Sequence, residues 1–254
     1  MKKETIGYFI LISLALTAIT GICFSPPIQQ DEDYHLFSDK DELLGVSNFW
    51  NVISNLPFLI IGALGILKLK HLKKSHAQYV LFFSSICFVG IGSAYYHLNP
   101  TTETLVWDRL PMSLAFMTLF SLIISEFIHE KAGKLLLAPL LLLGILSIAV
   151  WLIFNDLRFY ALVQFYPMLA IPAILIHFKS DNTTGKAYWL LLLAYILAKL
   201  MEHFDQEVHT QLKVISGHSL KHFTAAIGVY AITRNIIKQP EGVIKQVTGS
   251  ALKS

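Results

Sequence analysis

Long apolar runs separated by short polar segments are the feature that most constrains this sequence. Eight of them approach or reach the roughly 17 to 25 residues that a helix needs to cross a bilayer. They span residues 6–24, 49–67, 78–96, 105–125, 135–154, 159–176, 187–200 and 214–236. Composition agrees, because 54% hydrophobic and 15% charged residues exclude an ordinary soluble domain. The sequence therefore predicts an all-α integral membrane protein with several spans.

Lysine and arginine are shared unevenly between the two sides on which these runs would alternate. Fourteen of the 20 fall on the side of the amino terminus. Because cytoplasmic loops carry the positive excess, we expect both termini in the cytoplasm and the acidic loop 31–42 outside. The first run also resembles a signal peptide, but residues 17–23 lack a convincing small-x-small cleavage site, so an uncleaved anchor is favoured.

Cysteine usage and charge exclude several classes of function. Cys23 and Cys87 both fall inside apolar runs, so neither a disulfide framework nor a thiolate metal site is expected. Any bound metal must therefore be held by imidazole and carboxylate groups. The net charge is only +3, without a basic stripe or a recognition motif, so the expected partners are a membrane and a lipid rather than a nucleic acid.

A histidine, a serine and an aspartate lie close together in the sequence at the ends of two apolar runs. Ser93 and His97 are four residues apart and share a helix face, and Asp108 follows a short Asn-Pro-Thr-Thr break. His218 and His222 repeat the four-residue spacing at the start of the last run. The expected topology places all five at a similar depth below the non-cytoplasmic surface. Three imidazoles and a carboxylate are what a hydrolytic zinc site needs.

Two other interpretations remain open on these residues alone. The metal can be structural in a receptor or transporter-like bundle that binds a lipid without turning it over. Alternatively, the histidines only pack against one another in a small membrane scaffold that binds nothing. Ser93 is equally consistent with a small packing residue in a membrane helix.

Other polar residues have simpler structural explanations. Asn48, Asn51 and Asn55 form one stripe, for which interhelical hydrogen bonds are favoured over ligand contacts. Lys199 and Glu202 are spaced to form a buried ion pair. The acidic loop 31–42 is most simply solvated, although carboxylate oxygens also suit a hard cation such as calcium.

Three motifs, in order, resemble the alkaline ceramidases, within the CREST superfamily of membrane hydrolases. Residues 48–55, NFWNVISN, resemble the family's Glu-Phe-Trp-Asn-Thr-Ile-Ser-Asn. Residues 92–97, GSAYYH, with Asp108 and then LPM at 110–112, resemble its serine, histidine and Asp-Glu-x-Pro-Met block. Residues 217–222, GHSLKH, resemble its closing His-x-x-x-His.

The resemblance implies a zinc ion on His97, His218 and His222, with Ser93 and Asp108 as catalytic residues beside the activated water. It implies hydrolysis of the amide bond of ceramide or a related N-acyl lipid, giving a fatty acid and a sphingoid base or amine. It also implies a seven-helix transmembrane bundle with one additional N-terminal transmembrane helix. The chain would then divide into an anchor (1–25), an acidic extracytoplasmic loop (26–47), the ceramidase-like domain (48–237) and a cytoplasmic tail (238–254).

The sequence departs from the family pattern near these positions. Asn48 and Arg109 stand where the family has acidic residues, and Lys221 stands where it commonly has an aromatic residue. The family's Asp-Trp-Cys-Glu segment has only a loose counterpart here, in residues 39–42. The resemblance therefore implies an N-acyl lipid more firmly than ceramide itself, and it implies no definite calcium site.

Overall fold

The computed structural model describes residues 2–69, 75–180 and 185–238, and the regular structure in these ranges is helical, with no strands. The helices are α1 Lys3–Phe24, α2 Phe49–Ile53, α3 Leu56–Lys68, α4 His76–Leu98, α5 Thr102–Ile123, α6 Glu130–Phe154, α7 Arg158–His177, α8 Gly185–His203, α9 Asp205–Leu212 and α10 Gly217–Lys238. The all-α prediction is confirmed. The proposed cytoplasmic tail lies outside the described residues, except for its first position.

The described helices include six that are long and apolar enough to cross a membrane, or seven if α8 and α9, which meet at a bend of 78°, form one span. The chain is therefore an integral membrane protein. Although α10 has 22 residues, it does not belong to this group. Polar residues lie near both of its ends, with His218, Lys221 and His222 in the first two turns and Arg234 in the last two.

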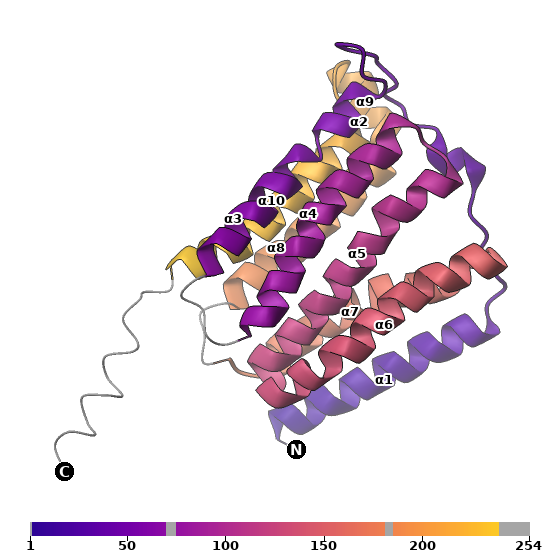
Figure 1. Ribbon diagram of the computed structural model, residues 1–254. Coiled ribbons are helices and arrows are strands. Elements are labelled where there is room, and N and C mark those ends of the chain that lie inside the picture. The colour runs from indigo at the N-terminus through magenta and orange to yellow at the C-terminus, as the bar shows by residue number, and fades with distance from the viewer. Residues whose placement is uncertain (1, 70–74, 181–184, 239–254) are drawn as a thin grey trace.

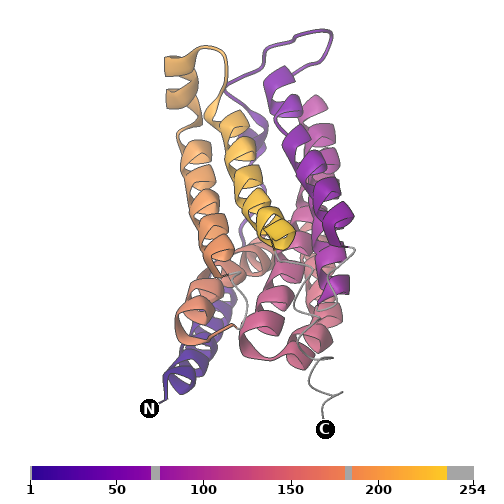
Figure 2. The same ribbon diagram turned by 90° about the vertical axis from the view of Figure 1, so that its left-hand side faces the viewer.

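The helices pack side by side in one bundle with α5 near its centre (Figure 1). In the span formed by α5 and the wider turn Ile124–Ile128, 72% of the most apolar window is buried, against 6% in α1. α4 and α6 pack against α5, and α10 packs between α8 and α3. α1 lies at the edge of the bundle against α7 (Figures 1 and 2). Its position at the edge agrees with the expectation of one additional N-terminal helix beside a bundle.

The expected run 49–67 is broken into two helices. Asn48 enters α2 with a left-handed φ of 50°, which asparagine tolerates better than most residues. α2 then ends at Ser54, and α3 begins at Leu56 with proline in its first turn. Proline lacks an amide hydrogen and is pre-organised for a helix start. The break places polar side chains at the end of the bundle where α4 ends and α10 begins.

The last part of the chain also differs from the expectation of a run beginning at Val214. The polar segment after α8 forms a separate short helix, α9, which ends where Lys213 adopts a left-handed φ of 61°. α10 then begins at Gly217. The difference matters because it makes His218 and His222 part of the first two turns of a helix, at the same end of the bundle as α9 (Figure 1).

Candidate metal centre

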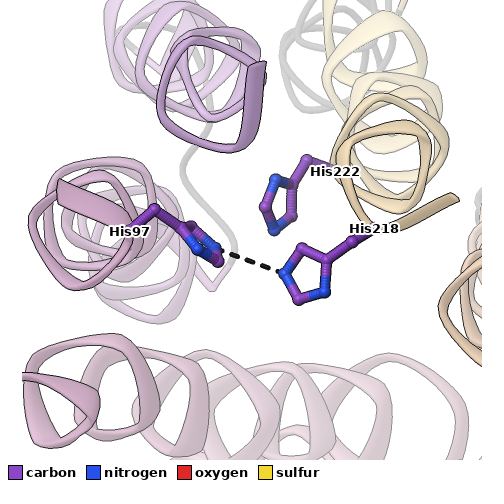
Figure 3. A group of neighbouring side chains, drawn as sticks. All are labelled: His97, His218 and His222. Carbon is purple, nitrogen blue, oxygen red and sulfur yellow. Dashed lines mark hydrogen bonds between the residues drawn. The ribbon is translucent and has the colours of Figure 1, made fainter. Parts of the chain in front are cut away.

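Three histidines from two helices converge in the bundle. His97 lies in the last turn of α4, whereas His218 and His222 lie in the first two turns of α10 and, four residues apart, share one face. One ring nitrogen from each lies within 4.8 Å of the others, and all three residues are buried. Figure 3 shows the three rings turned toward one another. The predicted meeting of these residues is confirmed.

One pair of histidines in the cluster has the spacing of two ligands of a tetrahedral metal ion. The Nε2 atoms of His97 and His218 are 3.3 Å apart. Two nitrogens bound to one tetrahedral zinc at 2.0–2.1 Å would lie about 3.3–3.4 Å apart. His222 accepts or donates a hydrogen bond at Nδ1 with the Ser54 hydroxyl, at 2.8 Å, which leaves its Nε2 for the centre of the cluster. Such a hydrogen bond is typical of a metal-ligating histidine.

Phe37, from the loop between α1 and α2, closes the cluster on one side. Its ring centroid lies 4.8 Å from that of His97 and 4.6 Å from that of His218, and the side chain is buried. This apolar contact excludes water from one side of the histidines. Phe37 therefore gives the loop a structural role. The acidic composition of the loop had predicted only a solvated segment.

Asp205, the first residue of α9, holds that loop and α10 together. One carboxylate oxygen accepts the backbone N–H of Ser38 at 3.1 Å, and the other accepts that of His218 at 2.6 Å. The second bond places a negative charge at the amino terminus of α10, where the helix dipole favours it. Asp205 therefore fixes the turn of α10 that carries His218.

Ser93 and Asp108 face the same cavity as His222. Ser93 lies one turn before His97 on α4, Asp108 lies on α5, and their side chains are within hydrogen-bonding reach of each other. Gly92 allows this approach, because a Cβ atom there would overlap the backbone carbonyl of Trp107. Both residues line a cavity together with His222.

That cavity has a volume of about 440 Å³ and runs from the polar residues into the apolar interior. Its apolar part is lined by side chains of α3, α4, α5 and α10, including Phe58, Phe82, Leu119 and Val229. Its polar part contains Ser93 and Asp108 and the charged residues Arg109, Lys199, Glu202 and Lys221. The cavity therefore suits a molecule with a long apolar part and a polar group near one end.

The interhelical hydrogen bonds expected for the asparagine stripe are present for Asn48 and Asn51, but Asn55 donates to the backbone carbonyl of Asn51 and lines the cavity. Asn48 donates to the backbone carbonyl of His97 at 2.9 Å, and Asn51 donates to that of Asp39 at 2.9 Å. The ion pair of Lys199 with Glu202 is present at 2.6 Å, and Lys221 joins it at 2.5 Å. Lys221 therefore forms a cluster of three charged side chains with Lys199 and Glu202. Its position between the two histidines of the His-x-x-x-His motif did not predict this cluster.

The acidic loop is the second place at which the sequence left a cation site open. In the part of the chain that the structure describes, the three histidines are the one group of three or more potential ligands that gathers closely. Asp39 is buried, and this burial raises the pKa of its carboxyl group, while one of its oxygens accepts the backbone N–H of Asp41. His35, to which the sequence assigned no role, contacts the Tyr96 hydroxyl at 2.9 Å.

Comparison with known proteins gives one family. The family model described as Ceramidase matches residues 44–238, which is more than half of the chain. The matched range contains all three histidines, Ser93 and Asp108. No curated protein matches the sequence.

Proposed function

Since this chain belongs to the ceramidase family and is a membrane hydrolase of the ceramide amide bond, we propose that His97, His218 and His222 hold a catalytic zinc ion. The observation that supports this most directly is the 3.3 Å separation of two Nε2 atoms within a buried group of three imidazoles. Neutral imidazoles suit zinc, and three of them leave one coordination position open. When bound, zinc polarises a carbonyl oxygen and lowers the pKa of water toward about 7.

Asp108 is proposed as the general base and then the general acid. Its carboxylate takes a proton as water adds to the amide carbon and returns that proton to the departing nitrogen. The C–N bond breaks, one water is consumed, and the products are a carboxylic acid and an amine. Asp108 is buried and lines the polar part of the cavity with Ser93 and His222, which supports a position for the reacting amide there.

Ser93 is proposed as the hydrogen-bond donor to the oxyanion that develops on the amide oxygen. Its hydroxyl group is buried one helical turn from His97 and is available on the cavity side. A donor held in place before the reaction needs no reorganisation as charge develops, which is why such donors matter for rate. The apolar part of the cavity would hold an acyl chain while the amide stays at the polar part.

Release of fatty acid from a fluorescent ceramide by the purified protein tests this proposal. His218→Ala should lower both the zinc content and the turnover, because it removes a ligand. Asp108→Asn should keep the zinc and lower turnover about 10²- to 10⁴-fold, because it removes only the proton transfer. His76→Ala is the matched control, since His76 is exposed at the start of α4 and should change neither.

Different outcomes separate the possible functions. Full turnover in the Asp108→Asn protein would remove Asp108 as the base. Zinc in the protein without hydrolysis of any N-acyl lipid would contradict the catalytic role of the metal and favour a lipid-binding bundle with a structural ion. Hydrolysis that persists after complete metal removal would exclude the metal from the reaction.

A further inference from the structure

Arg109 occupies an unusual place in the polar part of the cavity. It follows Asp108 on α5, is only 7% exposed, and lines the same cavity. Three aromatic rings surround its guanidinium group, with centroids 4.6 Å away in Trp151, 5.1 Å in Tyr160 and 5.2 Å in Tyr34. These rings hold the side chain in position and interact favourably with its charge.

No carboxylate neutralises this buried cation in the described part of the chain. Arg109 forms no ion pair there, and its buried Nη1 atom has no hydrogen-bond partner. Glu202 is already shared by Lys199 and Lys221. A buried guanidinium group normally has partners for its N–H groups, because desolvating an unpaired charge is costly.

The charged side chains that line the cavity carry a net positive charge. Its lining contains three cations, Arg109, Lys199 and Lys221, and two carboxylates, Asp108 and Glu202. A neutral lipid would leave the Arg109 guanidinium unpaired after the substrate had displaced water. An anionic group in the substrate would complete both its charge balance and its hydrogen bonds.

We propose that Arg109 is the binding residue for an oxyanion on the amine half of the substrate, so that the enzyme prefers N-acyl lipids with an acidic headgroup. This inference rests on the proposed function, in which the amide lies beside Asp108. Since Asp108 and Arg109 line the same cavity, the anion would lie close to the amide. The planar guanidinium group binds phosphate and carboxylate oxygens in pairs, which lysine cannot reproduce.

Three lipids with the same oleoyl chain test the proposal. They are ceramide, with a neutral hydroxyl group, ceramide 1-phosphate, with a phosphate monoester, and N-oleoylserine, with a carboxylate. For the wild-type protein we expect kcat/KM to be at least tenfold higher for one of the two acidic lipids than for ceramide. The acidic lipid that is preferred identifies whether phosphate or carboxylate is recognised.

Variants then locate the preference. Arg109→Met should lower kcat/KM for the preferred acidic lipid at least tenfold more than it lowers kcat/KM for ceramide. Arg109→Lys should retain only part of the preference. Arg234→Met is the matched control, because Arg234 is an exposed arginine near the end of α10 and its removal changes the net charge equally. It should leave the preference intact.

Binding provides a readout that is independent of turnover. The Asp108→Asn protein should bind the preferred acidic lipid at least tenfold more tightly than ceramide, and the double variant with Arg109→Met should lose that difference. Equal losses for acidic and neutral lipids in Arg109→Met, or no preference in the wild type, would overturn the proposal and leave Arg109 as a structural brace. If the wild type hydrolyses no lipid at all, the proposed function fails, and the binding comparison still decides the role of Arg109.

Discussion

Ser54 shows how one hydroxyl group can control the candidate metal centre without touching the metal. Its Oγ atom lies 2.8 Å from Nδ1 of His222 and is fully buried. This hydrogen bond fixes the ring orientation, so that Nε2 faces the other two histidines. Removing such a partner typically weakens metal binding because the free ring samples other orientations.

Ser54→Ala should therefore lower zinc affinity about 10- to 100-fold. The measurement is competition for zinc between the purified protein and a chelator of known affinity. Ser113→Ala is the matched control, since Ser113 is an equally buried serine that bonds backbone carbonyls between α5 and α6. An unchanged affinity in Ser54→Ala would mean that the helix and the contact with Phe58 suffice to orient His222.

The sequence predicts the site residues that occur in pairs at a helical spacing. His218 and His222 are four apart, and Ser93 and His97 are also four apart, so a helix places each pair on one face. The roles of Ser54 and Phe37 depend on contacts with helices far away in the sequence. For Ser54, the one local indication of a polar helix face is Asn51, three residues earlier. For Phe37, no local pattern in the sequence indicates a role.

At the scale of helices, the contact between α4 and α5 brings the proposed catalytic groups, Ser93 and Asp108, together. Gly92 and Trp107 mark their closest approach, beside Ser93 on one helix and Asp108 on the other. A backbone carbonyl cannot move aside as a flexible side chain can. A methyl group at Gly92 must therefore push the two helices apart exactly where Asp108 needs to stay near the histidines.

Gly92→Ala should destabilise the protein by about 1–3 kcal/mol, the usual range for overpacking, and should also reduce turnover. Thermal unfolding in detergent and fatty acid release measure the two effects. Gly21→Ala is the matched control, because no atom lies within 4 Å of its added methyl group, and alanine favours a helix. Normal activity in Gly92→Ala would show that this contact does not position Asp108.

The positions of the long helices were predictable, whereas their interruptions were not. A run of apolar residues with polar flanks predicts a span, and α4, α6 and α7 follow the expected runs within a few residues. The bend between α8 and α9 and the break at Ser54 depend on capping and on packing against the loop before α2. Asp205, for example, begins α9 and also bonds Ser38 and His218, contacts that no local pattern specifies.

At the scale of the whole molecule, the attachment of α1 explains why the extra helix stays with the core. Arg158, the first residue of α7, donates to the carbonyl oxygens of Ile22 and Ser25 at the end of α1, at 3.0 and 2.6 Å. It also pairs with Asp156, and hydrogen bonds from Arg158 hold the pKa of that carboxyl group at about 2. The carboxylate therefore stays charged, and the attachment intact, until the pH falls below about 4 and toward 2.

The orientation of the bundle decides on which side of the membrane the reaction takes place. α1 starts at one end of the bundle, and α10 starts, with His218, at the other (Figure 1). The excess of lysine and arginine on the side of the amino terminus predicts that this side is cytoplasmic. The three histidines would then lie toward the opposite face, together with the loop that carries Phe37.

Accessibility of single cysteines tests this orientation. In a background with Cys23 and Cys87 replaced by serine, Lys40→Cys marks the loop between α1 and α2, and Lys131→Cys marks the start of α6. Both lysines are exposed in the fold and lie at opposite ends of the bundle. A membrane-impermeant maleimide should label Lys40→Cys in intact cells or spheroplasts, but Lys131→Cys only after permeabilisation. The reverse pattern would place the histidines toward the cytoplasm, and ceramide or any related substrate would then have to enter the cavity from the cytoplasmic leaflet.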